Sequence, residues 1–277
     1  DKDGNLFEPF NGKQDLENGI VNFIGEADKR IKEDYLRILR YLRFFVNYSK
    51  QQHNSENIRK LKINISGILK LSKERLLDEL KKIAKPETLE KLLKDKISLE
   101  LILMIFPEFR NIKIFSKLNS IQKDLLKEKD FIFLLSLMII DETDNTDYFL
   151  YKFNISKKDQ RRIKSIDNFF KEKINSKTFT KNNMDKIFYY QGKEVILDIL
   201  CHKIIKSKKV DNSFKELIEH YEKKITPIMP VNGDFLMKKY KIPEGKQLGD
   251  KLRIIEDHWV KNNFKISDKD VDNIVNS

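Results

Sequence analysis

The sequence has very little cysteine, glycine or proline. Of its 277 residues one is cysteine, nine are glycine and six are proline. The single cysteine, Cys201, excludes an internal disulfide framework and any zinc site built on cysteines. Four glycines precede residue 26 and three follow residue 232. This distribution predicts a turn-rich start, a long helical middle and a compact tail.

Long hydrophobic runs are also missing. The longest is FIFLLSLMII at residues 131–140, which is flanked by Asp130 and Asp141. A bilayer span needs about 20 apolar residues, so a run of this length predicts a buried helix and no membrane association.

Negative charge is in the minority. The chain has 55 Lys and Arg against 43 Asp and Glu, which gives a formal charge of +12. An excess of this size favours a polyanionic partner such as nucleic acid. A chain so rich in Lys, Asn and Ile also reaches this charge by compositional bias alone, so charge leaves the question of nucleic-acid binding open.

The spacing of apolar residues predicts a mainly α fold. Two short apolar stretches, around Phe7 and at Ile20–Ile24, are separated by turn residues and predict two strands. From Asp28 the period changes to three and four, which is one face of a helix. Similar patterns predict further helices over residues 72–84, 86–93, 99–106, 131–140, 157–172, 183–207, 212–225 and 248–263.

The stretch EDYLRILRYLRF, residues 33–44, concentrates its charges. A step of three residues turns a helix by about 300°, so Arg37, Arg40 and Arg43 form one ribbon, with Asp34 one step earlier. One reading is a solvated face with an Asp34–Arg37 pair that contributes about 0.2–0.5 kcal/mol. The other is a nucleotide site, because arginine offers a planar fork of donors that matches phosphates and base edges, and this chain otherwise prefers lysine.

The motifs carry a family resemblance over nearly the whole chain. The first pattern, D-P-[FY]-x-G-x-x-D-L, is similar to part of GNLFEPFNGKQDLENGIVNFIG. The pattern that follows it, E-D-x-x-R-x-x-R-x-x-R-F, is similar to part of DKRIKEDYLRILRYLRF. A second pattern, S-x-E-R-[IL]-x-x-E-[LI], resembles LSKERLLDELKKIA, and a third, with three glycines, resembles PVNGDFLMKKYKIPEGKQLGDKL in the tail. These are motifs of the tRNA nucleotidyltransferase and poly(A) polymerase family, of the bacterial CCA-adding type.

The resemblance implies a role for particular residues. Asp34 and Arg37 match the pair that hydrogen-bonds the base of the incoming CTP or ATP, and Arg40 and Arg43 match nucleotide-binding positions. The residues expected to support that site are Glu33, Glu74 and Arg75. In the tail, the turn KIPEGKQLGDKL implies contact with tRNA through Gly245, Lys246 and Gly249, although a plain connection between helices is the alternative.

The resemblance also implies four parts. Residues 1–26 are expected to be the last strands of a nucleotidyltransferase head, 27–95 a neck that reads the base, 96–225 a helical body and 226–277 a tail that binds tRNA. The family's catalytic D-x-D after a glycine-rich loop is not found here. Asp1 and Asp3 fall just before Gly4, where the family has no catalytic pair.

We therefore expect an N-terminally truncated chain that is inactive alone, with no catalytic residue and no metal ligand of its own. The complete enzyme would use CTP, ATP and magnesium to add CCA to tRNA in the cytoplasm, or in mitochondria. A poly(A) polymerase and a non-catalytic RNA-binding helical protein are the alternatives. The oligomeric state is left open.

Other clusters of reactive side chains favour structural readings. The acidic stretch DETDNTD at 141–147 lacks the glycine and final glutamate of a calcium loop. Cys201 and His202 are adjacent and would point about 100° apart on a helix. We expect a packed cysteine beside a semi-exposed histidine. The basic runs at 157–164 and 202–210 are compatible with tRNA phosphates or with solvent.

Overall fold

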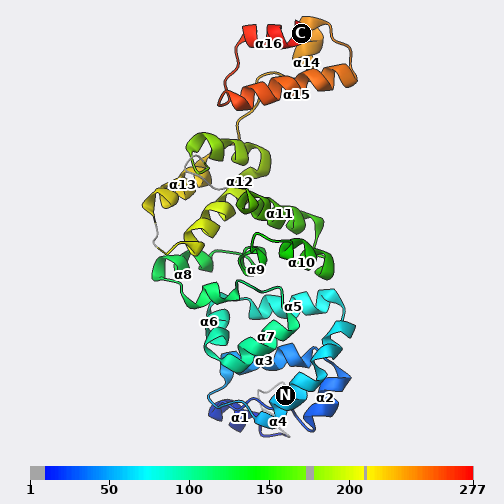
Figure 1. Ribbon diagram of the computed structural model, residues 1–277, viewed down its shortest axis with the longest axis vertical. Helices are drawn as coiled ribbons and strands as arrows, with labels where there is room; N and C mark the ends of the chain where they lie inside the picture. The colour runs from blue at the N-terminus through cyan, green and yellow to red at the C-terminus, as the bar shows by residue number, and fades with distance from the viewer. Residues whose placement is uncertain (1–9, 173–177, 209–210, 277) are drawn as a thin grey trace, which may run out of the picture. The chain divides into compact units, whose positions relative to one another are not determined.

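The computed structural model describes residues 10–172, 178–208 and 211–276. Over those residues the chain forms α-helices and two short 3-10 helices, and none of them lies in a β-strand (Figure 1). The predicted mainly α fold is therefore confirmed.

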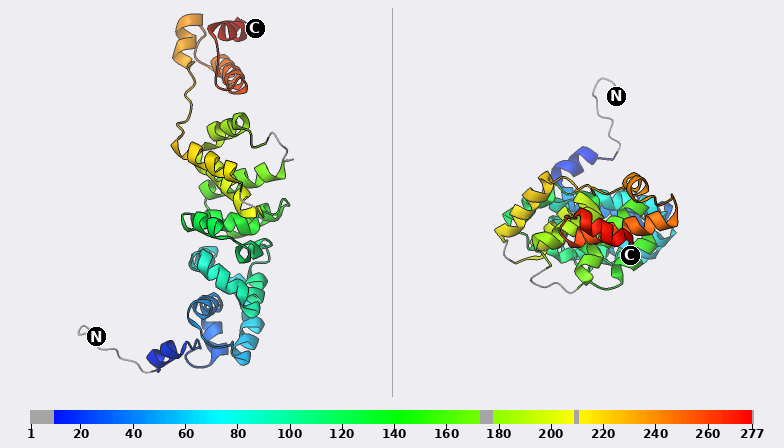
Figure 2. Two further views of the ribbon diagram at one scale, coloured as in Figure 1. Left: turned by 90° about the vertical axis from the view of Figure 1, so that its left-hand side faces the viewer. Right: turned by 90° about the horizontal axis from the view of Figure 1, so that it is seen from above.

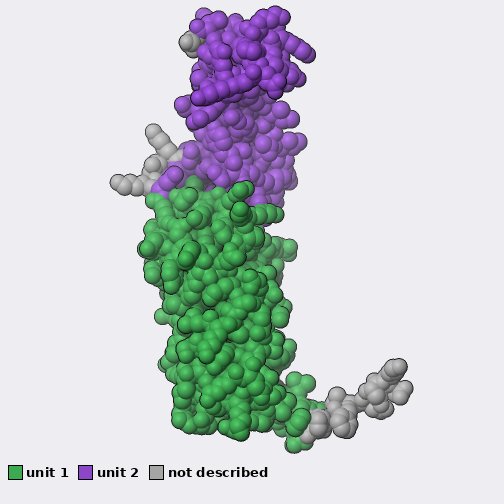
Figure 3. Space-filling model, turned by 90° about the vertical axis from the view of Figure 1, so that its right-hand side faces the viewer, with its two compact units in different colours: residues 1–171, 202–210 green, residues 172–201, 211–277 purple. Residues whose placement is uncertain are grey.

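The chain divides into two compact units, residues 1–171 with 202–210, and residues 172–201 with 211–277 (Figure 3). The division into head strands, neck, body and tail stays a prediction. The elements of the first unit up to the middle of the chain are α1 (Gly12–Asn18), α2 (Ala27–Glu33), α3 (Arg37–Tyr48), α4 (Ser55–Asn64), η1 (Ile65–Lys70), α5 (Lys73–Ile83), α6 (Pro86–Lys94), α7 (Lys96–Ile105) and η2 (Ile112–Ser116). The remaining elements of the chain are α8 (Ser120–Lys127), α9 (Phe131–Ile139), α10 (Asn145–Phe153), α11 (Lys157–Lys171), α12 (Lys181–Lys206), α13 (Asn212–Lys223), α14 (Gly233–Tyr240), α15 (Lys246–Lys261) and α16 (Asp268–Asn276).

The strand predicted at Ile20–Ile24 is wrong, and the stretch around Phe7 lies outside the described residues. Asn11 and Gly19 have left-handed backbones, with φ of 56° and 63°, and they flank helix α1 rather than separating two strands. The carbonyl of Gly19 accepts a hydrogen bond from the backbone N–H of Lys50 at 2.9 Å. The segment after α1 is therefore fixed against the end of α3 instead of pairing in a sheet.

Helix α3 lies at the centre of the first half of unit 1. Ile38, Leu39 and Leu42 are fully buried on one face, as the period of the sequence predicts. Helices α5, α6 and α7 all contact α3, and α4 packs against α2 (Figure 2). Ser72 and Asp95 cap the N-termini of α5 and α7 with their side chains, and Pro86 begins α6, so each of these helices starts at a residue suited to that place.

The apolar run at 131–140 forms α9, which is buried from Phe133 to Ile139 as predicted. Ser136 in its middle lies with Oγ 2.8 Å from Nε2 of His202. The expectation of a semi-exposed histidine is wrong, because the end of α12 that carries His202 packs into this core and leaves the side chain wholly buried. No described helix is long and apolar enough to cross a membrane.

The burial of His202 predicts a pH dependence of stability. Burial, reinforced by the charges of Lys206 and Lys129, holds the pKa of His202 well below its ordinary value of 6.5. The folded protein therefore keeps His202 neutral, and the stability this contributes is present above about pH 6.5 and falls as the pH drops below that value. The loss is at most about 1.4 kcal/mol per pH unit. Urea unfolding followed by circular dichroism between pH 7 and 5 measures it.

The variant His202→Gln is the matched comparison, since an amide can still hydrogen-bond Ser136 but does not titrate in this range. We expect its free energy of unfolding to decline less between pH 7 and 5 than that of the unaltered protein. The other histidines are common to both proteins and cancel. Equal slopes would show that His202 does not control this pH response.

Unit 2 contains the greater part of the kinked helix α12, up to Cys201, and a small helical cluster with its own core. Gly192 interrupts α12 with φ 85° and ψ 172°, so the single helix predicted over 183–207 is two segments. Helices α14, α15 and α16 enclose a separate apolar cluster formed by Val231, Leu236, Ile242, Leu248, Ile255 and Val271. These helices thus pack on an apolar cluster of their own near the end of the described chain.

Candidate nucleotide-base site

The predicted continuous helix through residues 33–44 is interrupted at Asp34. This residue is extended, with φ −153° and ψ 103°, so α2 ends before it and α3 begins after it. Its Oδ1 accepts a hydrogen bond from the backbone N–H of Leu36 at 3.1 Å, and its carbonyl accepts from the backbone N–H of Arg37 at 3.0 Å. An aspartate that bonds nearby N–H groups competes with helical backbone bonding, and this explains the break.

The break is also packed in place. The ring of Tyr35, next to Asp34, fills the space that a side chain on Gly67 would need, with a ring carbon 2.0 Å from that Cβ position. Because Gly67 has no side chain, the turn between α2 and α3 can pack directly against η1. The position of Asp34 is therefore set by tertiary packing as well as by its own hydrogen bonds.

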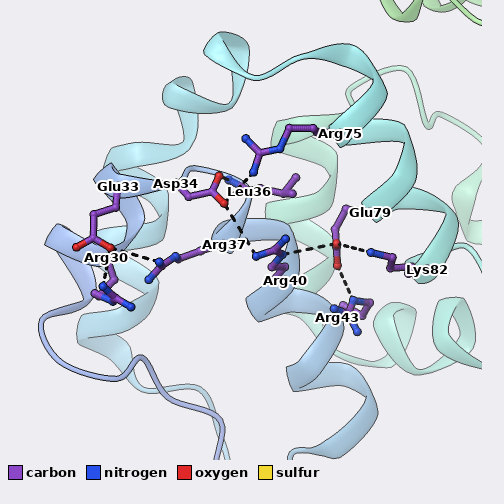
Figure 4. Close-up of polar contacts among 10 residues, drawn as sticks. All are labelled: Arg30, Glu33, Asp34, Leu36, Arg37, Arg40, Arg43, Arg75, Glu79 and Lys82. Carbon is purple, nitrogen blue, oxygen red and sulfur yellow. Dashed lines mark hydrogen bonds and ion pairs between the residues drawn. The ribbon is translucent and has the colours of Figure 1, made fainter.

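The three arginines lie along α3 as predicted, and each has a carboxylate partner (Figure 4). Nη2 of Arg37 lies 3.3 Å from Glu33, whereas Asp34 is the partner of a different arginine. Arg40 lies between two carboxylates, 4.0 Å from Asp34 and 3.8 Å from Glu79. Among the described residues, the predicted ion pair between Asp34 and Arg37 is not formed. Arg37 pairs instead with Glu33, and Asp34 pairs with Arg40 and with an arginine of α5.

Helix α5 holds the other side of this group. Nη2 of Arg75 lies 2.9 Å from Oδ2 of Asp34. Glu74, predicted with Arg75 to support the site, is exposed in the first turn of α5 and joins none of the contacts drawn in Figure 4. A carboxylate there interacts favourably with the positive end of the helix dipole.

Glu79 is the residue that the sequence reasoning missed. Its side chain is only 1% exposed, and its carboxylate receives Nε of Arg43 at 2.5 Å and Nζ of Lys82 at 3.3 Å, besides Arg40. A buried carboxylate needs such partners because desolvation disfavours its charge. The available signal was its place as the second glutamate of LSKERLLDEL, but nothing in that pattern showed its burial.

A cavity of about 220 Å³ opens beside the arginine ribbon. Arg30, Arg37 and Arg40 line it, together with the segment 21–24, Tyr41 and Phe44. Asp34 is not one of its lining residues. A pocket lined by both arginine and aromatic side chains suits a ligand that has both anionic groups and a flat ring.

The tail residues predicted to bind RNA lie at the start of α15 in unit 2. Gly245 precedes the helix with φ 148°, a value that favours glycine, and no side chain caps the helix there. Lys246 is its first residue, and no atom lies within 4 Å of the Cβ position at Gly249. These residues form one local group, separate in sequence and unit from the arginines of α3.

Among the described residues, no three His, Cys, Asp or Glu side chains gather in a group that could hold a metal ion. The residues described here thus do not fit a magnesium site, and no step through magnesium is assigned to them. Asp1 and Asp3 lie outside the described residues.

These features define a class, a mainly α protein with a preorganised arginine–carboxylate site. Comparison with known families identifies it further, since the family "tRNA nucleotidyltransferase domain 2" matches residues 124–270. This match covers more than half of the chain. The chain belongs to the tRNA nucleotidyltransferase family.

Individual relatives agree with this assignment. The mitochondrial CCA tRNA nucleotidyltransferase 1 of Homo sapiens is 28% identical over 271 residues, which cover 95% of this chain and 60% of that protein. The CCA-adding enzyme of Staphylococcus haemolyticus is 26% identical over 294 residues, covering 96% of this chain and 70% of that enzyme. The chain thus spans about 60% of the length of its human relative.

A solved structure shares the fold. The crystal structure of the Bacillus stearothermophilus CCA-adding enzyme in complex with CTP superposes with a TM-score of 0.64 at 17% identity, over 95% of this chain and 66% of that one. At this identity the likeness establishes the arrangement of helices and leaves the site residues to be argued from their own geometry.

Proposed function

We propose that this chain is the base-reading and tRNA-holding part of an enzyme that adds CCA to tRNA 3′ ends from CTP and ATP. The observation that carries the proposal is the junction of α2 and α3, where a carboxylate acceptor, Asp34, and a guanidinium donor, Arg37, stand three residues apart on a braced turn.

The chemistry of the bases explains why such a pair would select two of the four nucleotides. Cytosine and adenine both present an amino donor beside a ring-nitrogen acceptor on the edge used for base pairing, whereas uracil and guanine present an oxygen acceptor beside an N–H donor. A carboxylate only accepts and a guanidinium only donates. Asp34 would therefore take the amino group and Arg37 the ring nitrogen of CTP or ATP.

The surrounding contacts would keep the pair ready. Asp34 uses one oxygen for Leu36 and the other for Arg75, and each carboxylate oxygen has capacity for a further hydrogen bond. In the described part of the chain, the guanidinium of Arg37 pairs with one carboxylate, that of the exposed Glu33, which a nucleotide can displace. Arg40, at the edge of the cavity, would meet the phosphates, while Arg43 would extend the site by holding Glu79 and through it Arg40.

Magnesium would be held by a catalytic head and not by the residues described here. Two-metal transfer uses carboxylates to fix magnesium on the triphosphate. We propose that this chain supplies the base reader and that the carboxylates come from that head. We also propose a cytoplasmic or mitochondrial location, where tRNA is processed.

The start of α15 is the proposed tRNA contact in the tail. Free backbone N–H groups in the first turn of a helix favour a phosphate, and Lys246 adds a positive charge there. Gly245 and Gly249 leave the backbone open to approach, although the N–H of Gly249 itself donates to the carbonyl of Gly245 at 3.2 Å. The small helical cluster of α14–α16 would thus present one end of a helix to the RNA.

The variant Gly249→Ala separates helix stability from RNA contact. Nothing lies near the added methyl group, and alanine in place of glycine inside a helix stabilises it by about 0.5–1 kcal/mol. We expect thermal unfolding at a higher temperature together with weaker tRNA binding in a filter assay, since the methyl group would keep a phosphate away from the backbone. Unchanged tRNA affinity would remove Gly249 from the contact.

The proposed function is tested with labelled CTP and ATP on tRNA that lacks its CCA end. The 277-residue polypeptide is expected to bind this tRNA without extending it. The same residues joined to the catalytic head of the Staphylococcus haemolyticus relative are expected to add C, C and A. Extension by the polypeptide alone would contradict the assignment of the chemistry to a head, and a folded, tRNA-binding fusion that adds nothing would indicate an RNA-binding protein without a role in transfer.

A further inference from the structure

A second cavity, of about 450 Å³, lies in unit 1 away from the arginine ribbon. Three segments far apart in the sequence meet there: the residues Arg110 to Lys117, the loop that follows α9, and the end of α12 at Lys206. Nothing in the proposed base-reading function uses it.

The floor of this cavity is firmly built. Nδ2 of Asn111 donates to the carbonyl of Ile140 at 2.5 Å, and the backbone N–H of Asn111 donates to the carbonyl of Met138 at 3.0 Å. The buried side chain of Asn145 donates to the carbonyl of Ile139 at 2.7 Å. The backbone carbonyls of residues 138–140 are thus hydrogen-bonded by the two asparagines. These bonds fix the end of α9 and the start of the loop that lines the cavity.

Positive charge dominates the lining. Four cationic side chains, Arg110, Lys113, Lys117 and Lys206, face two carboxylates, Asp141 and Glu142. Asp141 is already occupied, because it accepts hydrogen bonds from Thr143 and lies 2.9 Å from Nη1 of Arg110. It therefore fixes the guanidinium of Arg110 in place instead of offering a free negative charge.

The lysines differ in how they are held. Nζ of Lys206 donates to the carbonyl of Ile140 at 3.3 Å, and burial lowers the pKa of Lys206 against the opposing effect of Glu142, Asp141 and Asp167. Lys113 and Lys117 are exposed on and just after η2, and neither contacts a carboxylate in the described part of the chain. An anion in the cavity would meet the partly buried ammonium of Lys206 and, at the rim, the ammonium groups of Lys113 and Lys117, which have no carboxylate partner among the described residues.

The residues that line the cavity favour a phosphate group over a nucleotide base. The one apolar side chain among the lining residues is Ile114, and no aromatic ring is found there. A base would have no flat surface to stack on, whereas phosphate groups need only donors and positive charge. The contact would be independent of RNA sequence.

We propose that this cavity is a phosphate-binding site for the sugar–phosphate backbone of tRNA, in which the exposed Lys113, Lys117 and Arg110 contact phosphates at the rim and the partly buried Lys206 meets one deeper in the cavity. The proposal rests on the proposed function for the identity of the RNA. Lys206, from the basic run 202–210, would then bind phosphate. Asp141, from the acidic stretch 141–147, would orient Arg110.

The test compares two charge-matched double variants in tRNA binding. Lys113→Ala with Lys117→Ala removes the rim lysines, and Lys91→Ala with Lys96→Ala removes two other exposed lysines of unit 1 that do not line the cavity. Fluorescence anisotropy with tRNA lacking its CCA end is measured across a series of salt concentrations. We expect the rim variant to bind about tenfold more weakly at low salt, and its salt slope to be lower by about 1.5–2. The control variant is expected to keep both values.

A second arm identifies the source of the phosphate. Acetylation of Lys113 and Lys117 is followed by mass spectrometry with tRNA, with CTP or with pyrophosphate added. Protection by tRNA alone supports the proposal, whereas protection by CTP or pyrophosphate without tRNA would overturn it in favour of a small-anion site. Equal binding by both double variants would refute this site while leaving the proposed function intact. Failure of the unaltered chain to bind tRNA would refute both.

Discussion

Replacing Asp34 with alanine is expected to lower the preference for CTP and ATP over UTP and GTP by about 10- to 100-fold, measured as relative kcat/KM in a protein that joins these residues to a catalytic head. The variant loses the carboxylate that would accept the amino group of the correct bases, and a hydrogen bond to a charged group contributes about 1.5–3 kcal/mol. Affinity for tRNA should change much less, because Asp34 carries no positive charge.

Two further variants make this result specific. Asp34→Asn keeps an oxygen for the N–H of Leu36 and adds an amino donor, so it should shift the preference toward UTP and GTP. Asp78→Ala removes an equally charged, exposed residue of α5 that pairs only with Lys81, and it should leave nucleotide choice unchanged. If Asp34→Ala weakened tRNA binding and left nucleotide choice intact, the base-reading role would be refuted.

Replacing Glu79 with alanine is expected to destabilise the fold by about 3 kcal/mol in urea unfolding. The variant leaves the guanidinium of Arg43, which is 20% exposed, without its carboxylate, and removing one partner of a buried ion pair strands the other charge. It also releases Arg40 and Lys82, although the contribution of these exposed cations is small because solvent screens them.

The control for this variant is on the same helix. Glu74→Ala removes an exposed carboxylate outside the network and should change the free energy of unfolding by less than about 0.5 kcal/mol. Glu79→Gln, which keeps the shape and one acceptor, should fall between the two. Equal stability of the Glu79→Ala and Glu74→Ala variants would show that Glu79 does not hold the arginines.

The sequence predicted the arginine ribbon correctly but not the turn that begins it. Apolar spacing places Ile38, Leu39 and Leu42 inside, as the structure has them, and sets the arginines on a different face of the helix. On that face Arg40 is exposed, whereas Arg37 and Arg43 are half-buried. The same spacing runs across Asp34 without interruption. The break there depends on a side-chain hydrogen bond to Leu36 and on Tyr35 packing against Gly67, and neither contact has a periodic signal.

The start of the chain and residue Glu79 show the same limit. The sequence has turn residues at Asn11-Gly12 and Asn18-Gly19, but turns bound a helix as well as a strand, and the structure has α1 between them. Glu79 reads as one more charged residue in an amphipathic helix. Its burial arises because α5 packs on α3, which brings residues 36 positions apart into contact.

The most direct test of the account measures whether Asp34 and the amino group of the base act on each other. In the head-joined protein, kcat/KM is compared for CTP and for the analogue triphosphate that lacks the amino group, with Asp34 present and with Asp34→Ala. The account predicts that the unaltered protein prefers CTP by about tenfold or more and that the variant hardly distinguishes the two, because each change removes the same hydrogen bond. An equal preference in both proteins would contradict the account, since the amino group would then be read by some other residue.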